Sequence, residues 1–425
     1  RLDDAAVARS ARVVVRRDYA TKVRGAKRVA IVSGGGSGHE PAHAGFVGEG
    51  LLTAAVCGDV FASPTARAVL AAIATVSSRE AGCLLIVKNY TGDRLNFGIA
   101  AETARSRLGI PVETVYVCDD AALPKAAQPR GLAGTVVVHK AAGALAATGA
   151  SLKDVANAAQ KAAESVATVG CALTECFVPG RPPSTSRLAD DEVELGLGIH
   201  NEPGAERVRP PPTASALAGI FVDKCLAKLS SKKASPPPKT VAIVVNNLGA
   251  TSHLEMAVFG AACLAACRER GLKVARICDG ALVTSVDAHG ASLTIARLDD
   301  DDTQDNLLAL LDAPCDAPCP IRFRPVDAEP LLAPADGLDD DFESLLPSEG
   351  TDTASGNTSS ANTVYLASHA PALRAAIVAA CDAVVAAEPE LTELDEKVGD
   401  GDCGVTLKAG ATAAKQAILT DTPLP

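Results

Sequence analysis

Hydrophobic and polar positions follow two different periods along the first part of the chain. Short apolar runs rich in β-branched residues predict strands at 28–36, 83–93, 112–120 and 135–140, the first two running into polar loops. Longer alanine-rich stretches predict helices at 64–78, 94–108 and 151–168. Ser151 precedes the last of these helices and is expected to be its N-cap. Strands that alternate with helices favour a mostly parallel sheet covered by helices, with ligand loops at the carboxyl ends of the strands.

The same alternation continues beyond residue 185. It predicts strands at 241–249 and 273–280 on either side of a helix at 252–270. Residues 326–362 then become acidic and rich in Ser, Thr, Gly and Pro, which is typical of a flexible linker. The chain after the linker is alanine-rich and predicts a helix at 369–388.

These shifts in composition divide the chain into three parts. We expect an α/β domain over 1–325 with lobes of about 1–184 and 185–325, a linker over 326–362, and a helical segment over 363–425. Because roughly sixty residues are few for an independent domain, we expect the helical domain to be incomplete.

Composition and charge narrow the class of function. Apolar residues make up 48% of the 425-residue chain, which is enough to form packed layers. A net charge of −11 argues against a broad surface for nucleic acid or an anionic membrane, and the longest apolar runs are too short to span a bilayer. The 13 cysteines are scattered without a CxxC motif, which favours a reduced, cytoplasmic protein. Cys263 and Cys267 fall in a predicted helix and are interpreted as packing residues.

The glycine-rich stretch SGGGSGHE at 33–40 follows a predicted strand. It lacks the final glycine of a dinucleotide fingerprint, the Gly-Lys-Ser/Thr of a Walker loop and the final glycine of a nucleophile elbow. Such a loop lets backbone N–H groups approach a small polar ligand, and His39 at its end is a candidate acid or base. The alternative is a tight turn with a capping histidine.

Two further loops carry candidate side chains. Lys88, Asn89 and Asp93 lie at the end of a predicted strand, and Asp93 is either a candidate base or the N-cap of the next helix. His200 lies in the bend LGLGIHNEPG, where a neutral imidazole is a competent nucleophile toward a carbonyl carbon. Such a bond would hold a very small substrate and would exclude polyols that lack a carbonyl. The alternative is a solvated turn residue.

Three carboxylates gather near the end of the chain, in LDEKVGDGDCG. Asp395, Asp400 and Asp402 lie within eight positions, and hard oxygen ligands at this density suit Mg²⁺. The spacing differs from that of an EF-hand. A solvated acidic turn is the alternative.

Five stretches of the chain resemble, in the same order, the motifs of the dihydroxyacetone kinase family in its single-chain, ATP-dependent form. They are GGGSGHEPAHAGFVGEG, FASPT, KNYTGDRLNF, GIHNEPG and KVGDGDCG. The resemblance covers nearly the whole chain. It implies a two-lobed α/β K domain that is commonly dimeric, followed by the start of an all-α L domain. In the family, this L domain is a helical barrel that brings ATP to the substrate.

The resemblance also implies a role for each matching residue. The dihydroxyacetone pocket would be lined by Gly36, Ser37, Gly38, His39, Lys88, Asp93 and His200. His200 would bind the carbonyl carbon covalently as a hemiaminal, with His39 as the acid/base group and Asp93 activating the terminal hydroxyl. Mg²⁺ and the phosphates of ATP would be held by Asp395, Asp400 and Asp402, beside Gly401, Cys403 and Gly404.

The function implied is ATP-dependent phosphorylation of dihydroxyacetone, with glyceraldehyde as a second substrate. Two alternatives stay open, an FAD-AMP lyase that forms cyclic FMN and a carbonyl-binding module without catalysis. A form supplied by a separate phosphocarrier protein is disfavoured, because its K and L parts are normally separate chains.

Overall fold

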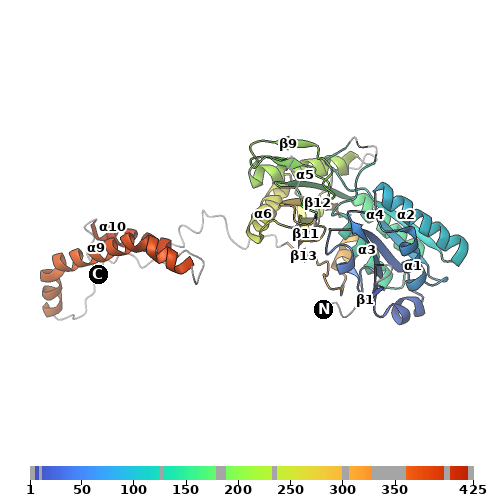
Figure 1. The fold of residues 1–425 in the computed structure, drawn as a ribbon, viewed down its shortest axis with the longest axis horizontal. Coiled ribbons are helices and arrows are strands. Elements are labelled where there is room, and N and C mark those ends of the chain that lie inside the picture. The colour runs from blue at the N-terminus through green and yellow to red at the C-terminus, as the bar shows by residue number, and fades with distance from the viewer. Residues whose placement is uncertain are drawn as a thin grey trace. The chain divides into compact units, whose positions relative to one another are not determined.

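A computed structural model describes residues 5–8, 12–124, 126, 128–178, 188–231, 237–298, 306–326, 360–396 and 403–419. The chain divides into a larger unit, Arg1–Glu329, and a smaller unit, Pro330–Pro425. The larger unit contains two sheets with their helices, and the smaller unit contains the helices α9 and α10 (Figure 1). This arrangement confirms the expected α/β class with a helical segment after it.

The first sheet has the strand order β1-β2-β4-β3-β5-β6. Its strands span, in that order, Ala5–Ala8, Val13–Arg16, Ala54–Val60, Ala30–Ser37, Cys83–Lys88 and Val112–Val117. β3 pairs in parallel with β4 and β5, and β5 pairs in parallel with β6, whereas β1 and β2 add antiparallel pairs. The parallel centre agrees with the prediction and brings the carboxyl ends of β3 and β5 to one edge of the sheet.

Helices cover both faces of this sheet because successive side chains of a strand point to opposite sides. The helices are α1 (Ala66–Val76), α2 (Thr91–Thr103), α3 (Thr135–Ala147) and α4 (Leu152–Ser165). Ala30 and Val32 of β3 belong to the core that includes α1 and α2. Ile31, between them, belongs to the core that includes α3 and α4.

The second sheet has the order β13-β11-β10-β12-β7-β8-β9. Its strands span, in that order, Arg324–Pro325, Lys273–Gly280, Thr240–Asn247, Gly290–Arg297, Val166–Ala172, Val193–Leu195 and Glu206–Val208. β10 and β11 are parallel, and the other pairs in the described part of this sheet are antiparallel. The expectation of mostly parallel sheets is therefore wrong here. The connection from β11 to β12, residues 281–289, lacks the crossover helix that a parallel strand needs.

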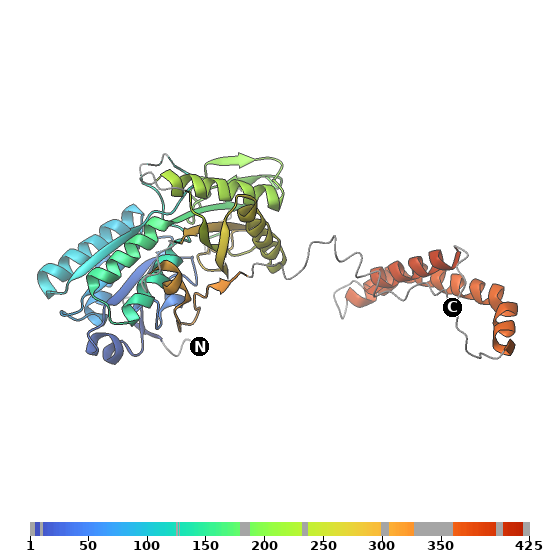
Figure 2. The same cartoon turned by 180° about the vertical axis from the view of Figure 1, so that it is seen from behind.

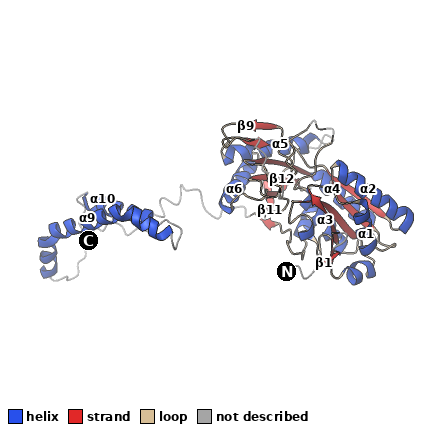
Figure 3. Cartoon of the chain, viewed as in Figure 1, coloured by secondary structure: helices blue, strands red, loops and turns tan. Residues whose placement is uncertain are grey.

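The second sheet packs against two different layers. On one face, α5 (Ala214–Ser231) and α6 (His253–Glu269) close a separate core. From the other face, Val244 and Ala296 join the core of α3 and α4. Figure 2 shows the same arrangement from behind, and Figure 3 shows the strands of both sheets with helices around them. The two lobes therefore share a continuous core.

Two elements differ from the sequence prediction. Residues 135–140 were expected to form a strand because three consecutive valines favour one, yet they begin α3. Every residue from Thr135 to Ala146 is buried, and a helix that is buried all round has no polar face to reveal its period. The predicted helix 151–168 ends at Ser165, where β7 begins and joins the second sheet. The second sheet thus starts before the expected lobe boundary near residue 185.

Other predicted elements are confirmed. The Ser151 side chain accepts a hydrogen bond from the backbone N–H of Asp154 and caps α4. α1 and α6 lie within one or two residues of their expected bounds, and Cys263 and Cys267 are buried packing residues of α6. α2 begins at Thr91 with Tyr90 as its N-cap residue, so the alternative that Asp93 caps this helix is wrong.

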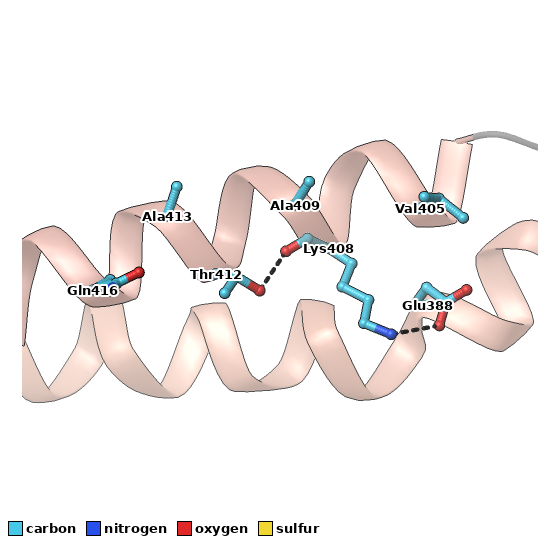
Figure 4. A pocket seen from close by; sticks show the side chains of 7 residues that line it. All are labelled: Glu388, Val405, Lys408, Ala409, Thr412, Ala413 and Gln416. Carbon is cyan, nitrogen blue, oxygen red and sulfur yellow. Dashed lines mark hydrogen bonds and ion pairs between the residues drawn. The ribbon is translucent and has the colours of Figure 1, made fainter. Parts of the chain in front are cut away.

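The smaller unit contains two long helices, α9 (Ser360–Glu396) and α10 (Cys403–Leu419), in agreement with the helix predicted at 369–388. A groove of about 450 Å³ lies between them. Lys408 Nζ reaches across it from α10 to Glu388 of α9 at 3.2 Å (Figure 4). None of the helices in the described ranges is both long and apolar enough to cross a membrane.

Candidate functional site

The candidate site lies at the carboxyl ends of β3 and β5. β3 leads into the loop that carries His39, and β5 ends at Lys88. The first turn of α2 then presents Asp93, and the segment between β8 and β9 carries His200. Because β3 and β5 are parallel neighbours, their carboxyl ends lie at the same edge of the sheet, and the loops that follow them can meet there.

Glycines are required in the loop after β3 because other groups approach its backbone closely. A Cβ on Gly36 would lie 2.7 Å from a backbone nitrogen of the neighbouring loop, and Gly38 has a φ of +100°. A Cβ on Gly35 would lie 3.2 Å from Lys88 Nζ and 3.7 Å from Asp93 Oδ2. Gly35 therefore faces the charged side chains of the site, a position that the sequence analysis did not single out.

His39 is fully buried and held in one orientation. Its Nδ1–H donates to the carbonyl oxygen of Thr284 at 2.7 Å. Its Nε2 has no hydrogen-bond partner within the part of the chain that the structure describes. Burial and the positive charges of Lys88 and His200 lower the pKa of His39 well below its usual value. His39 is therefore a neutral imidazole whose Nε2 lone pair can accept a hydrogen bond or a proton.

Lys88 and Asp93 are buried groups of opposite charge with incomplete hydrogen bonding. Lys88 is 1% exposed and Asp93 is 3% exposed. Within the described ranges, Lys88 Nζ and Asp93 Oδ1 lack hydrogen-bond partners. Burial lowers the pKa of Lys88 and raises the pKa of Asp93, and the charge of each opposes the shift of the other. Because unpaired buried polar atoms are costly, this arrangement is suited to a ligand that supplies the missing partners.

His200 is held by the acidic residue two positions after it. Its Nδ1–H donates to Glu202 Oε1 at 3.0 Å, and its backbone N–H donates to Glu202 Oε2 at 2.8 Å. Burial raises the pKa of Glu202, but its hydrogen bonds with His200 and the charge of that histidine outweigh burial and lower it to about 2. When the His200 imidazole is neutral, this hydrogen bond makes Nε2 the nitrogen with the lone pair.

Aromatic rings enclose the two histidines. The His200 ring meets the rings of His39, Tyr90 and Phe61 edge-on, with centroid distances of 4.8, 4.6 and 5.4 Å. Phe61 also stacks on His39 at 5.2 Å with an interplanar angle of 21°. The two imidazoles therefore lie together among aromatic rings, which is typical of a site that binds a small molecule.

Most of the residues predicted for the substrate pocket come together. Ring contacts, close approaches and electrostatic interactions show that these residues lie near one another: Gly36, Gly38, His39, Lys88, Asp93 and His200. Ser37 and Asn89 have structural bonds instead: Ser37 Oγ donates to Gly58 O at 2.8 Å and Asn89 Nδ2 donates to Pro129 O at 2.7 Å.

Three further residues lie at the site although no sequence pattern singles them out: Phe61, Tyr90 and Glu202. Phe61 and Glu202 are part of motifs quoted above, FASPT and GIHNEPG, and Tyr90 is part of KNYTGDRLNF. Their presence in those motifs was the available signal. No general spacing rule links an aromatic or acidic loop residue to a histidine elsewhere in the chain, so the pattern alone did not reveal their contacts.

The residues predicted to bind Mg²⁺ and nucleotide fall mostly outside the described part of the chain. Asp400, Gly401 and Asp402 lie outside the described residues, and the side chains of Asp395 and Cys403 lie outside them as well. Gly404 is described and packs against α9, where a Cβ would lie 2.4 Å from the carbonyl oxygen of Glu388. Within the described ranges, no group of three or more His, Cys, Asp or Glu side chains is placed to hold a metal ion.

Comparison with known proteins links this site to one family. Residues 2–319 match the family described as Dak1 domain. A triokinase/FMN cyclase from Bos taurus is 40% identical over 401 residues, which cover 91% of this chain and 64% of that protein. The chain therefore spans less than two thirds of the length of this curated relative.

Two solved structures extend the comparison. The dihydroxyacetone kinase from C. freundii in complex with AMP-PNP and Mg²⁺ is 38% identical, with a TM-score of 0.70 over 98% of this chain and 71% of that chain. A structure of the dihydroxyacetone kinase operon co-activator Dha-DhaQ is 33% identical, with a TM-score of 0.68 over 75% of this chain and 95% of that chain. Both are similar to this chain in fold.

Proposed function

The chain belongs to the Dak1 domain family, and from this premise we propose that it binds dihydroxyacetone at His200 and presents it for phosphorylation by ATP. One observation carries the proposal. Two imidazoles meet at 4.8 Å beside buried Lys88 and Asp93, whose hydrogen bonding is incomplete within the described structure. A small carbonyl compound with hydroxyl groups supplies both an electrophile for the imidazole and partners for the charged atoms.

His200 is the nucleophile in this proposal. Its Nδ1–H is donated to Glu202, so the Nε2 lone pair is available to attack the carbonyl carbon. The resulting N–C bond converts the ketone into a hemiaminal. A three-carbon substrate offers little surface for ordinary binding, and the covalent bond compensates for that deficit. The same bond selects carbonyl compounds over polyols such as glycerol.

His39 and Asp93 are the proposed proton acceptors. His39 Nε2 and Asp93 Oδ1 are buried acceptors that lack partners within the described ranges, so each can accept a hydrogen bond from a substrate hydroxyl. We assign the proton of the terminal hydroxyl to Asp93 as that oxygen attacks phosphorus, and we assign Lys88 to binding the substrate oxygens. Loss of one such acid/base group typically costs about 10²–10⁴ in rate.

The proposed phosphoryl donor is ATP with Mg²⁺. The related C. freundii kinase was crystallised with AMP-PNP and Mg²⁺, and the carboxylates of Asp395, Asp400 and Asp402 are the donor type that Mg²⁺ prefers. When bound, Mg²⁺ neutralises charge on the phosphates. The use of glyceraldehyde, a homodimeric state and a cytoplasmic location remain predictions.

Dihydroxyacetone labelled with ¹³C at the ketone carbon tests the covalent step. In the wild-type chain, we expect the carbonyl resonance to be joined by a protein-bound tetrahedral carbon. His200→Ala is expected to lose this signal, and His253→Ala, which changes an exposed histidine at the start of α6, is expected to keep it. A tetrahedral signal that persists in His200→Ala would place the bond on another residue and overturn the proposal.

A carbonyl-binding module without catalysis is the second candidate. It is favoured by the similarity to the co-activator Dha-DhaQ, which covers 75% of this chain. It predicts the same tetrahedral carbon but no consumption of ATP when Mg²⁺ and dihydroxyacetone are both present. The FAD-AMP lyase activity suggested by the triokinase/FMN cyclase relative is tested separately, by adding FAD with Mn²⁺ and looking for cyclic FMN.

A further inference from the structure

Glu202 contacts His200 through both of its carboxylate oxygens. Oε1 accepts from the imidazole Nδ1–H at 3.0 Å, and Oε2 accepts from the backbone N–H at 2.8 Å. The backbone of the turn makes this possible, because the Gly198 N–H donates to the Glu202 carbonyl oxygen at 2.9 Å. Asn201, between the two residues, adopts a left-handed φ of +67°. The chain therefore folds Glu202 back onto the imidazole that precedes it.

The contact selects one tautomer of His200. An ionised carboxylate has no proton to donate, so the imidazole nitrogen that faces it must carry the hydrogen. The pKa of Glu202, lowered to about 2, keeps the carboxylate ionised across the physiological pH range. In the neutral imidazole, Nδ1 therefore carries the proton and Nε2 carries the lone pair.

The space for the carboxylate depends on Gly198. A Cβ at this position would lie 2.0 Å from Glu202 Oε2 and 2.7 Å from Arg130 Nη1. Arg130 cannot move aside easily, since its Nε donates to Asp120 Oδ2 at 2.8 Å and its Nη2 donates to Gly196 O at 2.6 Å. Alanine at 198 would therefore displace the carboxylate while leaving every charged side chain in the protein.

We propose that Glu202 is a positioning residue that fixes the nucleophilic tautomer of His200 and pairs with the charge created when the adduct forms. This inference rests on the proposed function. When Nε2 bonds to the carbonyl carbon, the carbonyl π electrons move to the oxygen, which takes a proton from solvent water. The imidazole keeps its Nδ1 proton and becomes a cation next to the Glu202 carboxylate. The adduct is therefore stabilised by a charge-assisted hydrogen bond that is weaker in the free protein.

Two variants test the role by different routes. Glu202→Gln removes the charge and offers the imidazole both a donor and an acceptor, so either tautomer can be satisfied. Gly198→Ala keeps the carboxylate but displaces it. The matched control is Glu255→Gln, which alters a His–Glu pair on the surface, where Glu255 accepts from His289 Nε2 at 3.1 Å. Glutamine can also maintain the capping box that Glu255 forms with Ser252.

The tautomer is read without substrate, from the ¹⁵N chemical shifts of the histidine ring nitrogens in labelled protein. We expect one tautomer of His200 in the wild type and in Glu255→Gln, and a mixture in Glu202→Gln and Gly198→Ala. The equilibrium constant for the adduct, from the ¹³C experiment above, is expected to fall about 10- to 100-fold in both variants, as for loss of a hydrogen bond to a charged group.

The outcomes separate this inference from the proposed function. If the wild type forms no adduct, the proposed function fails, and the tautomer measurement still judges Glu202. If the wild type forms the adduct and folded Glu202→Gln keeps both a single tautomer and an unchanged equilibrium constant, the positioning role is refuted. A folded Gly198→Ala that behaves like the wild type refutes it independently.

Discussion

Replacing Lys88 by methionine is expected to stabilise the larger unit while it removes function. The Lys88 side chain is 1% exposed, and its Nζ has no hydrogen-bond partner in the described ranges. The pKa of Lys88 is lowered in the folded state, so the amine binds a proton more tightly in the unfolded protein. This difference lowers the free energy of unfolding, and the loss is complete at all pH values below the folded pKa. Methionine retains the length of the stem without the buried charge.

The size of the effect follows from the cost of an unsatisfied buried polar group. That cost is about 1–3 kcal/mol, and more for a charged group. Each kcal/mol raises the Tm by roughly 2–4 °C in a domain of about 150–250 residues, and by somewhat less in a larger unit such as this one. We therefore expect Lys88→Met to unfold several degrees above the wild type in differential scanning calorimetry near pH 6.

The stabilisation should depend on pH through Asp93. Lys88 opposes the rise in the pKa of Asp93, so removing Lys88 raises that pKa further. A carboxyl whose folded pKa is raised contributes stability that is full below its unfolded pKa and is lost as pH rises through the folded value. The gain from Lys88→Met should therefore shrink as pH rises through the raised folded pKa of Asp93, and the double variant Lys88→Met/Asp93→Asn should not show this decline.

Lys140 provides the matched control. It is also 1% exposed, but its Nζ donates to the carbonyl oxygen of Ala313. Lys140→Met would leave that carbonyl without its donor and should lower the Tm. The reasoning is refuted if Lys88→Met lowers the Tm at every pH, or if it stabilises the protein and still forms the dihydroxyacetone adduct with unchanged affinity.

Three further predictions concern the walls of the pocket and the metal. Phe61→Ala removes the ring that lies against both imidazoles and so makes room for a larger substrate. When a four-carbon and a three-carbon ketose compete in the ¹³C experiment, the share of the four-carbon adduct relative to the three-carbon adduct should rise about 10-fold or more. Gly36→Ala should lose about 1–3 kcal/mol of stability in urea denaturation, because its Cβ would meet backbone atoms at 2.7 Å. Asp400→Asn removes one carboxylate charge from the predicted metal site, and isothermal titration calorimetry should show weaker Mg²⁺ binding than in the wild type. Equal affinities in that titration would exclude Asp400 as a ligand.

The sequence predicted the fold where a segment has one polar and one buried face. α4 illustrates this case, with Ser151 as its cap, a buried face that includes Val155 and Ala159, and exposed polar residues opposite. The prediction failed at α3, where burial on every side removes the period and three valines favour a strand. It also failed at Val166–Ala172, where no turn residue marks the change from α4 to β7. In both places tertiary packing decided the local structure.

The same limit applies to the site. His39, Lys88 and Asp93 could be predicted because they follow strands, and the carboxyl ends of parallel strands are where ligands bind. His200 comes from a different region of the sequence, and only the family resemblance linked it to the others. Ser37 is predicted to bind substrate, and in the structure its hydroxyl donates to Gly58 O. A loop position indicates that a side chain is near the pocket, and the direction it points depends on contacts that the pattern does not contain.

The relative position of the two histidines depends on a third segment, which carries none of the proposed chemistry. Residues 284–286 precede β12 and bond to both loops. Thr284 O accepts from His39 Nδ1–H at 2.7 Å, and the Val286 N–H donates to Gly38 O at 2.8 Å. Ser285 Oγ donates to Ile199 O at 2.8 Å, next to His200. The glycine loop of the first sheet and the histidine loop of the second are therefore held by the same three residues. A covalent bond at Nε2 of His200 requires such registration, because it fixes where every other atom of a three-carbon substrate can lie.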